Sequence, residues 1–135
     1  MKVMVFVKAS PASEADVMPT TQLIAAMMKY NEELIAAGIL KGGDGLKSSK
    51  NGVRIQFSGD SRTVTNGPFA ETSELVAGYW LWEVSSMEEA ITWAKRCPNP
   101  MPDDSELEIR PLFAPEDFGD VYTDDMKVTY EKMQS

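Results

Sequence analysis

The sequence contains no histidine and only one cysteine, Cys97. Without histidine, no Ser-His-Asp or Cys-His catalytic arrangement can form, imidazole cannot act as a general base, and every metal site built on histidine is excluded. A single cysteine allows no intrachain disulfide and no cysteine-based zinc site, so we expect a reducing compartment, no metal and no cofactor. Any catalysis would have to use carboxylates, lysine, arginine, tyrosine or Cys97.

Positive charge is also scarce, because 13 Lys and Arg residues stand against 21 Asp and Glu residues, a formal net charge of −8. No basic cluster is present that would neutralise several phosphates, so we expect no nucleic-acid partner and no membrane-surface binding. No apolar run approaches the roughly 20 residues that cross a bilayer. The apolar run at the N-terminus stops at Lys8 and is too short for a signal peptide. A cytoplasmic location is therefore expected.

The length of 135 residues suits one domain with a sizeable core. A hydrophobic content of 43% and a charged content of 25% are ordinary for a globular chain. After Pro115 the sequence becomes acidic, while Met126, Tyr130 and Met133 keep helical spacing. We therefore divide the chain into a folded domain at 1–113 and an acidic, partly helical tail at 114–135.

Two segments read as strands that are apolar on both faces. Residues 2–9 alternate three valines with Met4, Phe6 and Lys8, and residues 79–84 place Trp80 and Trp82 on one face and Tyr79 and Leu81 on the other. Two shorter alternating runs, 53–57 and 62–65, flank a Gly-Asp turn and predict a β-hairpin. A final strand is expected around Leu107 and Ile109.

Two helices are expected between these strands. The first begins at Thr20 or Thr21, carries an apolar stripe at helical spacing and ends at Gly38. The second follows Ser85 and Ser86, where Glu88 and Glu89 complete two overlapping capping boxes, and ends before Pro98. The methionines of the first helix are interpreted as core residues, with an adaptable ligand surface as the alternative.

The element order is strand, helix, hairpin, long strand, helix, strand. It predicts an α+β, ferredoxin-like split βαβ fold with an antiparallel sheet and two helices on one face. Two helices cover only one face of such a sheet, yet its strands are apolar on both. Because solvated apolar surface costs about 25 cal/mol per Å², we expect a second copy to cover the other face. The prediction is a homodimer in which two sheets meet.

Two carboxylates are weak catalytic candidates. Asp44 lies among three glycines, Gly42, Gly43 and Gly45, in a segment that we interpret as a loop. This loop either holds Asp44 at a cleft or is simply an acidic turn. Glu71 follows the turn Asn66-Gly67-Pro68-Phe69. It either fixes the entry of the chain into the long strand or acts at the lip of a cleft.

Trp80 and Arg110 are, with Asp44, the candidate ligand-binding residues. Trp80 is a residue of the core, of the dimer interface or of a ligand platform. Arg110 shares a strand face with Glu108, so the two either pair with each other across neighbouring chains or Arg110 binds a ligand carboxylate. Cys97 is interpreted as a buried residue at a helix end, because no base accompanies it in the sequence.

The run 66–72 (Asn-Gly-Pro-Phe-Ala-Glu-Thr), together with 78–81 and 88–94, resembles the YCII-related family in its DGPF subgroup. The resemblance spans most of residues 1–113 and implies the dimeric α/β-barrel superfamily, but no generally established reaction. Asn66 stands where the subgroup carries Asp. The His-Asp pair of other YCII-like proteins has no histidine counterpart here, although Asp44 falls in the region of its acidic residue.

Three functional readings remain open from the sequence. The first is a homodimeric domain that binds or senses a small molecule. The second is a metal-independent enzyme in which Asp44 or Glu71, with its pKa raised by burial, acts as general base on a small organic substrate. The third is a partner-binding module that uses the acidic tail. The absence of any nucleophile paired with a base favours binding.

Overall fold

The structure, a computed structural model, describes all 135 residues and contains one four-stranded antiparallel sheet. The strand order is β2-β5-β1-β6. The strands are β1 (Lys2–Lys8), β2 (Leu40–Gly45), β5 (Val76–Glu83) and β6 (Leu107–Pro111). β1 lies at the centre, paired with β5 on one side and β6 on the other. This is the split βαβ arrangement, so the predicted α+β fold is confirmed.

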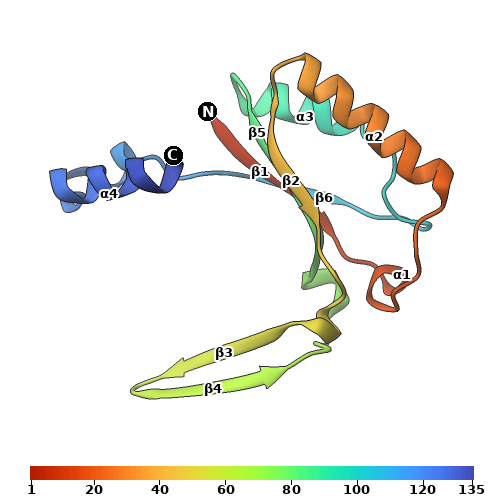
Figure 1. Cartoon of the computed structure of the whole chain (residues 1–135), viewed down its shortest axis with the longest axis horizontal. Coiled ribbons are helices and arrows are strands. Elements are labelled where there is room, and N and C mark those ends of the chain that lie inside the picture. The colour runs from red at the N-terminus through yellow and green to blue at the C-terminus, as the bar shows by residue number, and fades with distance from the viewer.

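Two helices, α2 (Thr21–Ala36) and α3 (Met87–Lys95), cover one face of this sheet (Figure 1). Thr20 caps α2 by accepting a hydrogen bond from the Leu23 amide, and the chain leaves the helix through Gly38 at φ +74°. Ser86 caps α3 through the Glu89 amide, and the Glu89 carboxylate accepts from the Ser85 amide. The predicted helix starts and the glycine stop are therefore confirmed.

The core lies between the sheet and the two helices. Its fully buried members include Val3, Val5, Trp82 and Leu34. The Tyr30 hydroxyl donates a 2.6 Å hydrogen bond to the backbone carbonyl of Trp93, which joins α2 to α3. Burial of this hydroxyl raises the pKa of Tyr30. The two helices and the apolar side chains of β1 and β5 thus form one continuous core.

The segment around Asp44 is a strand, which corrects the predicted loop. Leu40–Gly45 forms the edge strand β2, paired with β5. A Cβ atom at Gly43 would lie 2.8 Å from the Tyr79 carbonyl and 2.9 Å from Cδ1 of Trp80. The glycine therefore permits a close approach of two strands rather than a turn. Glycine has low strand propensity, so sequence patterning could not reveal β2.

The hairpin forms as predicted but is not part of the main sheet. β3 (Val53–Ser58) and β4 (Ser61–Asn66) pair only with each other, between β2 and β5 in the sequence. A further short helix, α1 (Pro11–Glu14), occupies the predicted polar connection after β1, and Ser10 and Ser13 form its capping box. Alternation identified the hairpin strands, but it carries no information about which sheet they join.

The Asn66-Gly67-Pro68-Phe69 turn attaches the root of the hairpin to the domain. The Phe69 amide donates a 3.0 Å hydrogen bond to Ser49 Oγ in the short 3₁₀ helix η1 (Ser49–Asn51). The Glu14 carboxylate accepts from the Ser49 amide at 2.9 Å and from the Ser49 hydroxyl. A Cβ atom at Gly67 would collide with the Ser49 carbonyl. The turn therefore requires glycine for packing.

The hairpin and the tail both project from the side of the sheet opposite α2 and α3 (Figure 1). The tail contains the 3₁₀ segment η3 (Pro115–Val121) and the helix α4 (Asp124–Gln134). A series of aromatic contacts holds the tail together. Ring centroids are 4.8 Å apart for Phe113 and Phe118, and 5.3 Å apart for Phe118 and Tyr122.

Gly67→Ala is expected to lower the free energy of unfolding by about 3 kcal/mol, because the added Cβ overlaps backbone that cannot move without breaking the Ser49 contacts. The measurement is urea denaturation followed by circular dichroism. Gly45→Ala is the matched control, because its Cβ would meet nothing within 4 Å. Equal stability losses in the two variants would contradict this packing role for Gly67.

Candidate ligand-binding site

A groove of about 520 Å³ lies between α2 and the β2–β5 side of the sheet. We call it the site groove. Its lining residues come from five segments: Val7; Met27, Met28 and Asn31; Leu40 and 42–45; 77–80; and Pro100 with Met101. The volume falls within the range of small-molecule sites, and the lining is mainly apolar with a few polar groups.

Trp80 forms a fixed wall of the site groove. Its Nε1–H donates a 2.9 Å hydrogen bond to Oδ1 of Asn31, and the Tyr30 ring meets it edge to face with centroids 5.9 Å apart. The side chain is only 6% exposed. The hydrogen bond satisfies the indole donor, which would otherwise be buried without a partner. Trp80 is thus held in one orientation by groups from α2.

The opposite edge of the site groove is the glycine-rich strand β2. A Cβ at Gly42 or Gly45 would meet no atom within 4 Å, so a ligand can approach the backbone there. Asp44 also lines the groove, is exposed and pairs with Tyr79 across the strands. The groove therefore offers an amide from Asn31 and strand-edge backbone beside an aromatic wall, whereas the Asp44 side chain shares the sheet face of Tyr79, away from Trp80.

The structure brings Asp44 and Trp80 to the same groove but places Arg110 elsewhere. Arg110 lies on β6, at the sheet edge opposite β2. Its guanidinium is 3.7 Å from the Glu108 carboxylate, which also lies 3.8 Å from Lys8 Nζ. Arg110 and Glu108 thus pair within one chain, whereas the expected pairing was across neighbouring chains. Ligand binding by Asp44, Trp80 and Arg110 stays a prediction.

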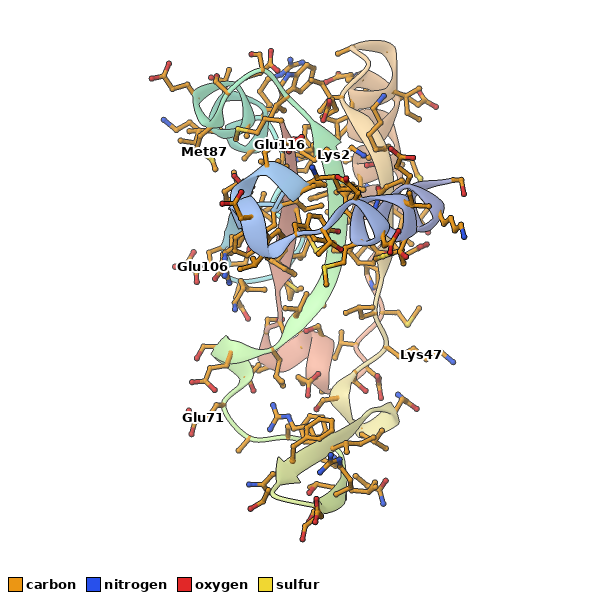
Figure 2. All side chains as sticks on the ribbon, turned by 90° about the vertical axis from the view of Figure 1, so that its left-hand side faces the viewer. Lys2, Lys47, Glu71, Met87, Glu106 and Glu116 are labelled. Atoms are coloured by element: carbon orange, nitrogen blue, oxygen red, sulfur yellow. The ribbon has the colours of Figure 1, made fainter.

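Glu71 does not line the site groove. It adopts a left-handed conformation at φ +61°, just before the 3₁₀ helix η2 (Thr72–Glu74), and points outward from the ribbon (Figure 2). Both Glu71 and Asp44 are exposed. The general-base hypothesis required a buried carboxylate, and the structure provides neither burial nor a partner base. Catalysis by either residue stays a prediction.

Several groove residues escaped the sequence reasoning. Met28 is 57% exposed and lines the groove, although the helix methionines were interpreted as core. Met27 does pack against the core, and it lines the groove as well. Asn31 follows Met27 by four positions, so it places a polar amide on the apolar stripe of the helix. That amide was the sequence feature that could have indicated a binding residue. Pro100 and Met101 come from a distant loop, and no local pattern marks them.

Most of the chain matches a known protein family. Residues 1–113 match the YCII-related domain. The chain belongs to the YCII-related family. It is 32% identical over 101 residues to "Uncharacterized protein R00369" of Rhizobium meliloti (strain 1021), an alignment that covers 75% of this chain and 78% of the relative.

Among solved structures, the YCII-related chain is similar to 5-chloro-2-hydroxyhydroquinone dehydrochlorinase (TftG) from Burkholderia phenoliruptrix AC1100, in complex with 2,5-dihydroxybenzoquinone. The TM-score is 0.46 at 16% sequence identity, over 86% of this chain and 98% of the other. No cluster of three or more potential metal-ligating His, Cys, Asp or Glu side chains occurs in the structure. None of its helices combines the length and the apolar character that crossing a bilayer requires.

Cys97 is partly buried next to the end of α3, and burial raises the pKa of its thiol to about 11. The thiolate is the reactive form, so the folded protein should alkylate slowly. At pH 8 we expect iodoacetamide to modify Cys97 about 100-fold more slowly in the folded protein than in protein unfolded in urea, where the thiol has its ordinary pKa. The rate is measured by mass spectrometry, and similar rates in both states would contradict burial of the thiol.

Proposed function

We propose that this YCII-related protein, which we assign to the DGPF subgroup, is a homodimeric domain that binds or senses a small organic molecule in the site groove. The single observation that carries the proposal is the groove itself. An aromatic wall held by Asn31 faces an edge strand whose glycines leave backbone open to a ligand. Such a site suits recognition by shape, stacking and a few hydrogen bonds.

The groove suits a neutral aromatic or hydroxylated ligand. Trp80 provides an apolar ring surface, and the Asn31 amide is the polar side chain beside it. No lysine or arginine lines this groove, so it offers no cationic side chain to an anionic ligand. Hydrogen bonds to Asn31 or the β2 backbone would orient hydroxyl groups.

The test uses the methionine methyl groups as probes, because Met27, Met28 and Met101 line the groove whereas Met126 and Met133 lie in the tail. Protein carrying ¹³C-methyl methionine is titrated with neutral phenols and catechols, and two-dimensional NMR spectra are recorded. We expect binders to shift the three groove methyls and leave the tail methyls in place. Failure of every such compound to shift Met27 and Met28 would overturn the proposal.

Met28→Glu provides the matching variant, because it introduces a charge into the apolar lining at an exposed position that tolerates it. A weakening of binding by about tenfold is expected, about 1.4 kcal/mol. Ile35→Glu is the control, since Ile35 is 62% exposed on the same helix and does not line the groove. An equal loss of affinity in the control would place the binding site elsewhere.

The homodimer is supported by apolar surface on the side of the sheet that the helices leave free. Cross-strand pairs place Met4 beside Leu81 and Phe6 beside Tyr79 on this face. The projecting hairpin adds an apolar face of its own: Val53, Ile55, Phe57 and Val64 are all more than half exposed. A second sheet packed against this side would bury these groups, as a stable interface of about 1,600 Å² requires.

Sedimentation equilibrium at micromolar concentration is expected to give about twice the 14.9 kDa chain mass. Leu81→Arg should shift the protein to monomer, because a charge would be buried between the sheets. Ile91→Arg on α3, which faces away from this surface, should leave the dimer intact. Circular dichroism checks that the variants fold, and Met4→Lys offers a second disruption of the same face. A wild-type monomer would contradict the dimer.

A further inference from the structure

A second hollow, of about 680 Å³, adjoins the site groove. We call it the annex. It is enclosed by α1, the connection 17–20, the start of α2, residues 45–48 and the loop 100–102. Gly45, Ala77, Pro100 and Met101 line both hollows, so the two hollows share a wall. Nothing in the proposed groove site requires this additional space.

The lining of the annex exposes apolar side chains that the fold leaves without a partner. Met18 is 80% exposed and Val17 is 61% exposed, and Leu46 is exposed as well. Leu23 and Met101 extend this apolar lining inward. Contiguous exposed apolar surface of this kind marks a binding site more often than a single exposed residue does.

Prolines restrict the backbone around the annex. Pro19, Pro100 and Pro102 line it, and proline fixes the backbone around it. The Ser10 hydroxyl donates to Sδ of Met101 at 3.2 Å, and Ser48, another lining residue, is buried. Preformed walls reduce the entropy that binding must overcome.

The charge at the annex favours an anion. Lys47 lines it and takes part in no ion pair. The other charged lining residue is Asp16, whose carboxylate pairs with Lys50. That lysine holds the pKa of Asp16 below its ordinary value, so the pair is neutral overall at physiological pH. The annex therefore combines an apolar lining with one uncompensated positive charge.

We propose that the annex binds the apolar chain of an elongated amphipathic carboxylate, with its anionic group at Lys47 and its far end reaching into the site groove past Met101. This deepens the proposed small-molecule function and rests on it for the groove end of the ligand. The class is a medium-chain fatty acid or an alkyl-substituted carboxylate. The occupant is a small molecule because the hollow, at about 680 Å³, falls within the range of small-molecule sites.

Decanoate is the probe, and the methionine methyls again report its position. Met18 lines only the annex, Met27 and Met28 line only the groove, and Met101 lines both. Decanoate should shift Met18, Met101 and, because its far end reaches the groove, Met27. Shifts at Met27 without a shift at Met18 would contradict ligand binding in the annex and would still be consistent with the groove site. Shifts at Met18 when no phenol moves Met27 would support the annex while the groove proposal fails.

Lys47→Glu should raise the dissociation constant for decanoate about tenfold, through loss of attraction and added repulsion. Lys41→Glu is the control, because Lys41 is exposed on the adjoining strand β2 and lines neither hollow. It should change the constant less than about twofold, since salt screens distant charges. Equal effects from both variants would overturn the contact with Lys47.

Two further measurements test whether a cationic amphiphile or a second copy of the chain occupies the annex instead. Decyltrimethylammonium has a similar chain with the opposite charge, so binding as tight as that of decanoate would overturn the proposed anion. A Met18 shift that follows protein concentration and is unaffected by decanoate would show that a second copy fills the annex, and would also overturn the proposal. A saturable decanoate shift that is independent of protein concentration would support it.

Discussion

The packing of Trp80 is the constraint on which the rest of the structure depends. Its ring touches the backbone of β2 at Gly43, where no side chain fits, and its indole nitrogen is bound to Asn31 on α2. One side chain of β5 therefore requires glycine at position 43 of the edge strand and helps fix where the first long helix lies. The groove exists because these three elements meet around a ring that is fixed on two sides.

Periodicity predicted the parts of the fold that bury apolar side chains regularly. The strands at β1 and β5, the two capped helices and the hairpin all follow from alternation, helical spacing and capping residues. β2 did not, since its Gly42-Gly43-Asp44-Gly45 stretch shows none of the side-chain patterns by which a strand is recognised. β2 pairs with β5, and its Gly43 packs against Trp80. Residues that are close to β2 in the sequence do not indicate this long-range contact.

The candidate site was predictable only in part for a related reason. Asp44 and Trp80 are residue types that often bind ligands, so the sequence alone made them candidates. They line one groove because β2 pairs with β5. Arg110 has suitable chemistry, but the strand order places β6 at the far edge. That order follows from long-range pairing rather than from local pattern. Pro100 and Met101 enter the lining from a loop more than 60 residues after α2 ends, so no local signal connects them with it.

The exposed apolar residues of this chain fall into sets with different physical origins. Those on the free sheet face arise because two helices cannot cover both faces of one sheet. Those at the annex line a hollow beside the core, next to one unpaired lysine, where a flat sheet could not pack. A second protein sheet suits a broad surface, whereas a small amphipathic molecule suits a hollow of limited volume.

The short helix η1 lies between the annex and the root of the hairpin. Ser48, immediately before it, lines the annex, while Ser49 within it holds the Phe69 amide at the root of the hairpin and is itself held by Glu14. A ligand in the annex would therefore contact Ser48, whose neighbour Ser49 anchors the projecting arm. The Gly67 turn is the reason for this proximity, because it brings the hairpin root against η1 closely enough to exclude any side chain.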